Sequence, residues 1–131
     1  MLEAESFVLV LEDPDAPREQ PFVHWLIWNI PGTAVGLPRG VPTEPRIKDG
    51  ELKGAVQGRN DAGVFGYYGP KPPPGHGVHH YHFQLFALDK TLPMEPTTPL
   101  AELLNALKRD SIAKADLIGT YEMADGPQPP A

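Results

Sequence analysis

The sequence predicts a β-dominated fold in one domain spanning residues 1–131, and the proline, glycine and apolar content carries that prediction. Seventeen prolines and 13 glycines make up 30 of the 131 residues, about twice the average share. Apolar residues account for 40% of the chain, enough for a hydrophobic core at this length. The turn-forming residues therefore belong to loops between strands, and a helical bundle is excluded. Residues 123–131 predict a frayed tail.

Three apolar segments predict the main strands. Residues 6–12 contain an unbroken apolar run, the pattern of a short strand buried on both faces, and prolines follow it directly. Residues 22–30 and 78–88 predict the second and third strands. In the second strand, a period of two places five side chains on one face: Phe22, His24, Leu26, Trp28 and Ile30.

The third strand carries three of the five histidines, and the same period divides them between its faces. His79 and Tyr81 lie with Phe83 on the core side. His80 and His82 lie on the other face, which is the more polar one, and we expect that face to be solvated.

The connection between the second and third strands, residues 31–74, is rich in glycine and proline. A structureless loop of this length is unusual inside a compact domain, and long loops that do occur are usually functional. We expect short irregular strands near residues 52–57 and a binding loop in the rest.

One helix is predicted over residues 99–109. Thr98 fits the N-cap, and Pro99 fits the first helical position. A short helical turn around residues 112–115 and a last strand near 117–121 are expected to follow. The apolar stripe of the helix consists of Leu100, Leu103, Leu104 and Leu107.

Charge and residue usage exclude several classes of function. Eleven basic against 17 acidic residues give a net charge of −6, whereas nucleic acids and anionic membranes select basic surfaces. No apolar run approaches the roughly 18 residues of a membrane-spanning helix. The acidic first residues differ from the positive start of a signal peptide, so we expect a cytoplasmic location. The absence of cysteine rules out disulfides and thiolate metal sites.

Motifs of common enzyme classes are missing as well. The only serines, Ser6 and Ser111, are not at a sharp strand-to-helix turn of the kind that presents a nucleophile. The sequence has no glycine-rich phosphate loop and no dinucleotide fingerprint. We therefore expect a binding protein without a cofactor, and not an enzyme.

His80 and His82 leave a second interpretation open. A His-x-His pair on one strand face is a spacing by which β proteins hold metals, which makes a metal-dependent enzyme or metal-binding β protein the alternative. Zinc requires at least a third ligand, and the next acidic residue, Asp89, lies only at the end of the strand. A solvated strand face accounts for the two histidines more simply.

Two long segments carry a family resemblance. The first joins Asp13-Pro14-Asp15-Ala16-Pro17 to Phe22-Val23-His24-Trp25, and the second runs from Gly66-Tyr67-Tyr68-Gly69 through the prolines to residue 83. In this order they resemble the two signatures of the phosphatidylethanolamine-binding protein family, also called Raf kinase inhibitor-like proteins. The stretch at 117–121 is similar to the bacterial and archaeal branch, and the resemblance covers residues 6 to 122.

The resemblance implies an antiparallel β-sandwich with a small pocket that binds phosphate-like anions, such as phosphoethanolamine or phosphorylated groups. It also implies that the protein modulates a kinase or protease partner. The ligand-binding residues that it implies are Asp13, Asp15, His24, Pro73, Gly77, His79 and Tyr81.

The chemistry of these residues agrees with an anion pocket. Imidazole N–H groups of His24 and His79 and the Tyr81 hydroxyl are donors, and the turn over residues 75–78 offers backbone amides. Asp13 would repel a bare phosphate. It fits the pocket if it holds an imidazole in one tautomer, or if it meets the cationic amine of the ligand.

Two departures from the family pattern bear on the structure. His80 stands where arginine is usual, which weakens an Asp–Arg contact near the pocket. Family members also carry some tens of residues, including early strands, ahead of the first strand found here. A sheet without those strands exposes an edge or an apolar face, so we expect self-association as a two-fold homodimer.

Overall fold

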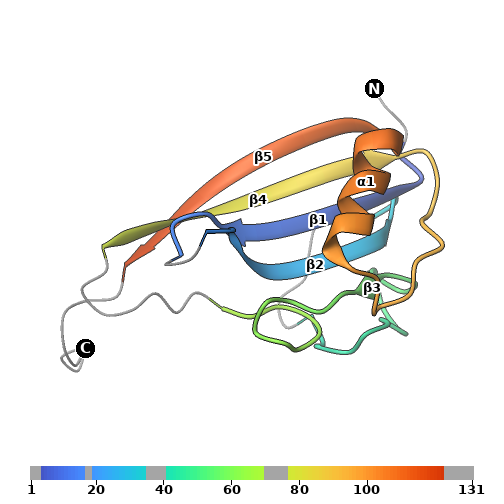
Figure 1. Ribbon diagram of the computed structural model, residues 1–131. Coiled ribbons are helices and arrows are strands. Elements are labelled where there is room, and N and C mark those ends of the chain that lie inside the picture. Colours follow the sequence, from blue (N-terminus) through green and yellow to red (C-terminus); the bar gives the residue numbers. More distant parts are fainter. Residues whose placement is uncertain (1–3, 17–18, 35–40, 70–76, 123–131) are drawn as a thin grey trace.

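A computed structural model of the chain describes residues 4–16, 19–34, 41–69 and 77–122 (Figure 1). The strands form one antiparallel sheet in the order β3-β2-β1-β4-β5. The β-dominated, antiparallel character and the single helix are thus confirmed, while a second sheet of a sandwich stays a prediction. The elements are β1 (Ser6–Asp13), β2 (Phe22–Pro31), β3 (Val56–Gln57), β4 (Val78–Leu88), α1 (Leu100–Asp110) and β5 (Ser111–Glu122).

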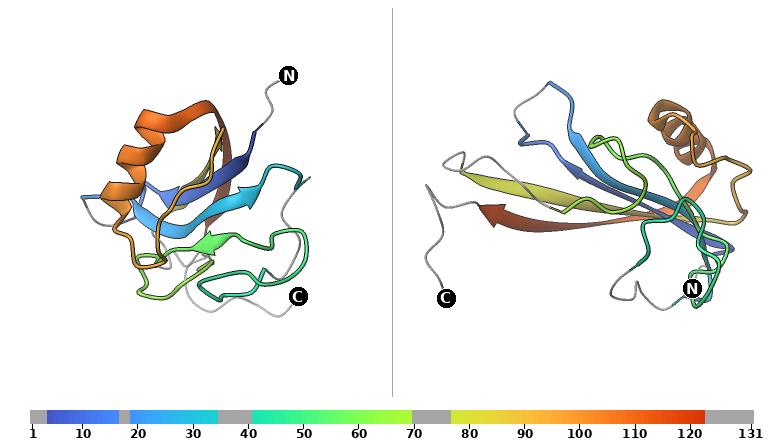
Figure 2. Two further views of the ribbon diagram at one scale, coloured as in Figure 1. Left: turned by 90° about the vertical axis from the view of Figure 1, so that its right-hand side faces the viewer. Right: turned by 90° about the horizontal axis from the view of Figure 1, so that it is seen from below.

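The sheet is covered differently on its two faces. Helix α1 packs on one face, and the segment of residues 41–68 lies over part of the other (Figure 2). Strand β1 lies at the centre and is buried on both sides, as predicted: Val8 and Val10 contact the α1 side, and Leu9 and Leu11 contact the other. Burial of both faces explains the unbroken apolar run in this strand.

Strand β2 departs from the simple alternation that the sequence predicts. Leu11 pairs with Trp25 and Glu12 pairs with Val23, so His24 is an extra residue without a partner position on β1. This β-bulge shifts the alternation by one residue. Val23 packs on the α1 side, and His24 lies on the opposite face.

A second irregularity lies near the end of β2. Phe7 pairs with Ile30 and Leu9 pairs with Ile27, which leaves one more extra residue on β2. Asn29 has a φ of +55°, in the left-handed region that asparagine tolerates, and its side-chain amide exchanges two hydrogen bonds with the backbone of Leu92. The predicted common face of β2 is therefore wrong for Phe22, His24 and Ile30. His24 and Ile30 lie with the cluster opposite α1, and the Phe22 ring packs against His24 on that side.

The buried side chain of Gln57 holds the long connection against β2. Its Oε1 accepts a hydrogen bond of 2.6 Å from Trp25 Nε1, and its Nε2 donates to the carbonyl oxygens of Pro42 and Glu44. Of the short strands expected near residues 52–57, only the two residues of β3 form a strand. Residues 52–55 form hydrogen-bonded turns instead.

The helix is confirmed with small corrections. Pro99, and not Thr98, is the N-cap, and Ala106 is buried in place of Leu104, which is 43% exposed. In the described residues, no helix is both long enough and apolar enough to cross a membrane.

The predicted helical turn at residues 112–115 is wrong. The chain passes from α1 directly into β5, where Ala113 pairs with Ala87 and Lys114 with Phe86. Local helix propensity of alanine and lysine is worth only tenths of a kcal/mol per residue, and pairing along the whole of β4 outweighs it.

Substitution of two neighbouring leucines of α1 tests how the helix packs on the sheet. Leu103 is 1% exposed within the α1-side core, so Leu103→Ala should lower the free energy of unfolding by about 2–5 kcal/mol. Leu104→Ala, the matched control, should change it by less than about 0.5 kcal/mol. Urea unfolding followed by circular dichroism measures both. Similar losses for the two variants would contradict the described orientation of the helix.

Candidate functional site

A small cavity lies on the face of the sheet away from α1. Its volume is about 210 Å³. Pockets for drug-sized ligands occupy about 300–1,000 Å³, so this cavity suits a smaller group. Residues from four strands and from the segment before β4 line it: Leu11, His24, Tyr67, Tyr68, Tyr81, Phe83, Gly119 and Thr120.

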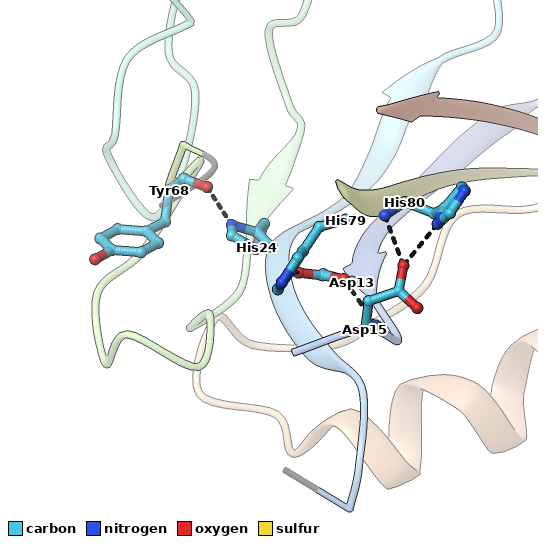
Figure 3. A network of polar contacts seen from close by, with 6 residues as sticks. All are labelled: Asp13, Asp15, His24, Tyr68, His79 and His80. Atoms are coloured by element: carbon cyan, nitrogen blue, oxygen red, sulfur yellow. Dashed lines mark hydrogen bonds and ion pairs between the residues drawn. The ribbon is translucent and has the colours of Figure 1, made fainter. Parts of the chain in front are cut away.

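His24 reaches the cavity because of the bulge in β2. The side chain is 4% exposed, and its Nδ1 lies 2.6 Å from the carbonyl oxygen of Tyr68. A carbonyl oxygen only accepts hydrogen bonds, so Nδ1 carries the proton and donates. The backbone N–H of Tyr68 donates in return to the carbonyl oxygen of His24. This exchange ties the segment before β4 to the bulge and fixes the imidazole (Figure 3).

Aromatic rings surround the His24 imidazole. Its centroid lies 4.8 Å from that of Phe22, 5.9 Å from that of Tyr68 and 5.3 Å from that of Tyr81. The Tyr68 ring stacks on the imidazole, whereas the Tyr81 ring meets it edge-on. These contacts restrict rotation of the side chain and exclude water from most of its surface.

His79 and Asp13 form a buried pair next to this group. His79 Nδ1 lies 2.5 Å from Asp13 Oδ2, and both side chains are almost inaccessible to solvent. The other carboxylate oxygen of Asp13 accepts a 2.8 Å hydrogen bond from the backbone N–H of Asp15. Removing one partner of a buried pair costs about 3–5 kcal/mol, because the other polar group stays buried without it. The hydrogen bond to Asp13 orients the His79 imidazole. Asp13 itself is not among the residues that line the cavity.

Asp15 forms a second carboxylate–imidazole pair, on the outside of the molecule. Its Oδ2 accepts hydrogen bonds of 2.7 Å from the backbone N–H and from Nδ1 of His80. The side-chain bond, followed by the backbone bond, lowers the pKa of Asp15 below 3.8. An Asp–Arg contact near the pocket was expected to be weaker here, because His80 stands where arginine is usual. Asp15 and His80 nevertheless form that contact.

The predicted site residues do not all lie at the cavity. His24 and Tyr81 line the cavity, and His79 and Asp13 lie buried beside Tyr81, with the His79 and Tyr81 centroids 6.4 Å apart. Asp15 lies instead on the exposed side, against His80. Gly77 has a φ of +94°, a conformation that favours glycine. Pro73 lies outside the described residues.

The described residues contain no group of three or more histidine, aspartate or glutamate side chains placed to hold a metal ion. His80 is engaged by Asp15, and Glu12, which lies opposite His82 on β1, accepts a hydrogen bond from Gln84. His80 is exposed and His82 is partly buried, so the solvated face predicted for them is found at this end of β4. It does not extend along the strand, because Phe86 and Leu88 on the same face are buried on the α1 side.

Comparison with known proteins identifies the family. The family model described as "Phosphatidylethanolamine-binding protein" matches residues 2–122, which is nearly the whole chain. The chain belongs to the phosphatidylethanolamine-binding protein family. Membership confirms the resemblance seen in the two sequence segments.

Relatives and solved structures agree with the family match. A UPF0098 protein of Pyrococcus horikoshii is 46% identical over 90% of this chain. The crystal structure of Escherichia coli YbcL, described as a new member of the mammalian PEBP family, superposes with a TM-score of 0.77 at 34% identity over 94% of the chain. A putative homologue from Chlamydia trachomatis gives the same TM-score at 36% identity over 93% of the chain.

The relatives are longer proteins. The chain spans 58% of the length of the Pyrococcus horikoshii relative and 64% of the YbcL sequence. It covers 74% of the YbcL chain in the crystal structure and 74% of the Chlamydia trachomatis one.

Several residues that line the cavity were not singled out from the sequence. Tyr67 and Tyr68 form two of its walls, and Gly119 and Thr120 of β5 form another. The adjacent tyrosines within a glycine-rich segment were an available signal, since exposed aromatic residues in loops are enriched at binding sites. Gly119 and Thr120 lie in the stretch that resembles the bacterial and archaeal branch, but only the pairing of β5 with β4 shows that they reach the cavity.

The pKa of Asp15 offers a test of the exposed pair. His80→Ala should raise this pKa toward 3.8, because the side-chain hydrogen bond from His80 is the largest cause of its lowering. The pair contributes stability that is present above the ordinary pKa of 3.8 and is lost as pH falls through the lower folded-state pKa. Carbon-13 NMR titration of the side-chain carboxyl measures the shift. An unchanged Asp15 titration in His80→Ala, with His82→Ala as the control, would show that the described contact does not form.

Proposed function

We propose that this protein binds small phosphate-containing or other anionic groups, with phosphoethanolamine as the prototype, in the cavity beside His24. Membership of the family supports a ligand-binding role. The observation that carries the proposal is the buried His24 imidazole, which lines the cavity while its Nδ1 is engaged by the Tyr68 carbonyl oxygen.

The engagement of Nδ1 determines what His24 can offer a ligand. In the neutral ring Nε2 is an acceptor, because the proton resides on Nδ1. Nε2 then accepts a hydrogen bond from an ammonium group or from a protonated phosphate. When the ring takes up a proton, Nε2 becomes a charged donor to a phosphate oxygen. Binding of an ionised phosphate is therefore coupled to protonation of His24.

The walls of the cavity suit a ligand that also carries a cation. Tyr67, Tyr68 and Tyr81 present aromatic rings, and ring faces attract ammonium groups by about 0.5–2 kcal/mol, more when water is excluded. Asp13 faces His79 and not the cavity, so the carboxylate supports an imidazole and does not meet the ligand amine. A small zwitterion such as phosphoethanolamine satisfies both the imidazole and the rings.

As part of the same proposal, the cavity binds its ligand and does not catalyse a reaction on it. A kinase or protease partner and a cytoplasmic location remain predictions from the sequence. The metal-dependent alternative gains no support from the described residues, where His80 and His82 lack a third ligand.

Binding of phosphoethanolamine tests the site directly. His24→Asn keeps a donor near the position of Nδ1, which preserves the contact with Tyr68, and deletes Nε2. This variant should stay folded and bind about tenfold to a hundredfold more weakly, the loss expected for one charge-assisted hydrogen bond. Isothermal titration calorimetry with phosphoethanolamine and with inorganic phosphate measures the affinities.

His82→Ala is the matched control, since His82 lies on the opposite face of β4. Its affinity should stay within about twofold of the wild type. Equal losses in His24→Asn and His82→Ala, or no loss in either, would overturn the proposed site. Tighter binding of phosphoethanolamine than of inorganic phosphate is expected from the aromatic walls.

Proton uptake provides a second, independent test. At pH 7.5 most of a phosphate monoester is doubly ionised, since its second pKa is about 6. Donation from Nε2 to such a phosphate requires a proton on both ring nitrogens, so a proton taken up on binding is visible as a dependence of the calorimetric enthalpy on the ionisation enthalpy of the buffer. The dependence should vanish in His24→Asn. Binding without proton uptake in the wild type would exclude the imidazolium as the phosphate donor.

A further inference from the structure

The bulge turns two backbone carbonyl groups of β2 toward one segment of the chain, residues 58–68. Carbonyl oxygens of successive strand residues normally point to opposite edges of the strand. At the bulge, the Val23 oxygen accepts a hydrogen bond of 2.9 Å from the backbone N–H of Asp61. The oxygen of the next residue, His24, accepts one of 2.9 Å from the backbone N–H of Tyr68. The segment therefore supplies the partners that the irregular backbone needs.

Asp61 is bonded to Val23 through its side chain as well as through its backbone. Its Oδ2 accepts a hydrogen bond of 2.8 Å from the backbone N–H of Val23. A carboxylate and a peptide N–H thereby take the places of the carbonyl and N–H groups that a neighbouring strand would present. Hydrogen bonds to a carboxylate are stronger than those between neutral groups. Asp61 thus holds both backbone groups of the residue that precedes His24.

The buried side chain of Asn60 fixes the turn that carries Asp61. Asn60 is 3% exposed, and its Nδ2 donates a hydrogen bond of 2.9 Å to the carbonyl oxygen of Gly66. Its Oδ1 accepts hydrogen bonds from the backbone N–H groups of Ala62 and Val64, at 2.9 and 3.3 Å. Because these bonds lie within the turn itself, the turn keeps its shape without help from β2. The Asp61 carboxylate is therefore presented to β2 from a fixed position.

Two kinds of interaction fix the His24 imidazole. Apolar packing fixes its face, because Val23 is buried in the α1-side core and the bulge turns the next side chain to the cavity. Hydrogen bonds fix its position on that face. The Tyr68 carbonyl oxygen lies 2.6 Å from Nδ1 (Figure 3), and Asp61 holds the backbone one residue earlier. A binding group needs such support, because it must be held to within about 0.5 Å of its productive geometry.

We propose that Asp61 is a positioning residue for the ligand-binding imidazole of His24. The proposal rests on the proposed function, because it concerns the same cavity. Asp61 is not among the residues that line the cavity, and it acts through the backbone of β2. Its carboxylate holds the Val23 N–H, and this bond keeps the bulge in the one arrangement that aligns the imidazole. Without the carboxylate the aligned arrangement is less populated, and the affinity for ligand falls with that population.

Two substitutions of Asp61 separate the hydrogen bond from the charge. Asp61→Ala removes the acceptor and should weaken binding of phosphoethanolamine about tenfold, the loss expected for one hydrogen bond to a charged group. Asp61→Asn keeps an acceptor oxygen and should bind within about twofold of the wild type. Both variants remove one negative charge, which by itself favours binding of an anion. Weakening in Asp61→Ala is therefore opposite in sign to the effect of the charge. Isothermal titration calorimetry measures the affinities.

NMR spectra of the His24 imidazole test the positioning without any ligand. The contact with the Tyr68 carbonyl oxygen places the proton of the neutral ring on Nδ1, so nitrogen-15 spectra of the wild type should show that tautomer. Asp61→Asn should give the same spectrum. In Asp61→Ala the nitrogen shifts should move toward those of a tautomer mixture. Proton contacts between the His24 and Tyr81 rings, whose centroids are 5.3 Å apart, should weaken in the same variant.

Glu95→Ala is the matched control. The carboxylate of Glu95 is exposed and pairs with Arg46, so this variant also removes one negative charge and one polar contact of a loop. It should bind phosphoethanolamine within about twofold of the wild type and leave the His24 spectrum unchanged. Urea unfolding of every variant measures stability separately. A purely structural role of Asp61 would lower the stability of Asp61→Ala and leave the affinity and the His24 spectrum of the folded protein unchanged.

Each outcome decides the proposal. Weaker binding and an altered His24 spectrum in Asp61→Ala, both recovered in Asp61→Asn, support it. A loss of stability alone overturns it, as does an equal loss of affinity in Asp61→Asn or in Glu95→Ala. A wild type that binds no phosphoethanolamine contradicts the proposed function instead. The spectra of the ligand-free variants then still decide whether Asp61 positions the imidazole.

Discussion

A single extra residue in β2 determines how the chain is arranged around the cavity. Under strict alternation Val23 and His24 would exchange faces, and the imidazole would lie on the α1 side of the sheet. Because Leu11 pairs with Trp25 and Glu12 with Val23, the bulge turns His24 to the opposite face. Bulges are frequent beside binding sites for this reason, since they re-aim one side chain without disturbing the rest of a strand.

The bulge also provides the attachment for the segment that precedes β4. Asp61 Oδ2 accepts the backbone N–H of Val23 at 2.8 Å, and the backbone N–H of Asp61 donates to the Val23 carbonyl oxygen. Tyr68 and His24 exchange a further two hydrogen bonds. The backbone groups around the bulge are thereby satisfied, and the same contacts bring the two tyrosines over the cavity.

Two aspartates in one short turn serve different purposes because they differ in burial. Asp13 is the last residue of β1 and is buried. Its hydrogen bond with His79 fixes that imidazole beside Tyr81. Asp15 binds His80 on the surface, where water screens the interaction and its contribution to stability is small. The Asp-Pro-Asp segment thus connects the site to β4 on both faces of that strand.

The three main strands and the helix could be predicted from the sequence alone. Their signals are local: an apolar run in β1, a period of two in β4, a leucine stripe with a proline at its start in α1. The same period assigned His79, Tyr81, His80 and His82 to their faces correctly, because β4 is regular over these residues. The two segments that resembled the family signatures were likewise sufficient to place the chain in its family.

The face of His24, the start of β5 and the walls of the cavity depend on contacts between segments that are distant in the sequence. A bulge depends on how two strands align, and no periodicity within β2 reveals that one residue lacks a partner. Residues 112–115 have the composition of a helical turn, yet pairing with β4 makes them a strand. Leu11 and Thr120 meet at one cavity although they are far apart in the sequence. Contacts of this kind are properties of the assembled sheet, so a single segment of sequence does not encode them.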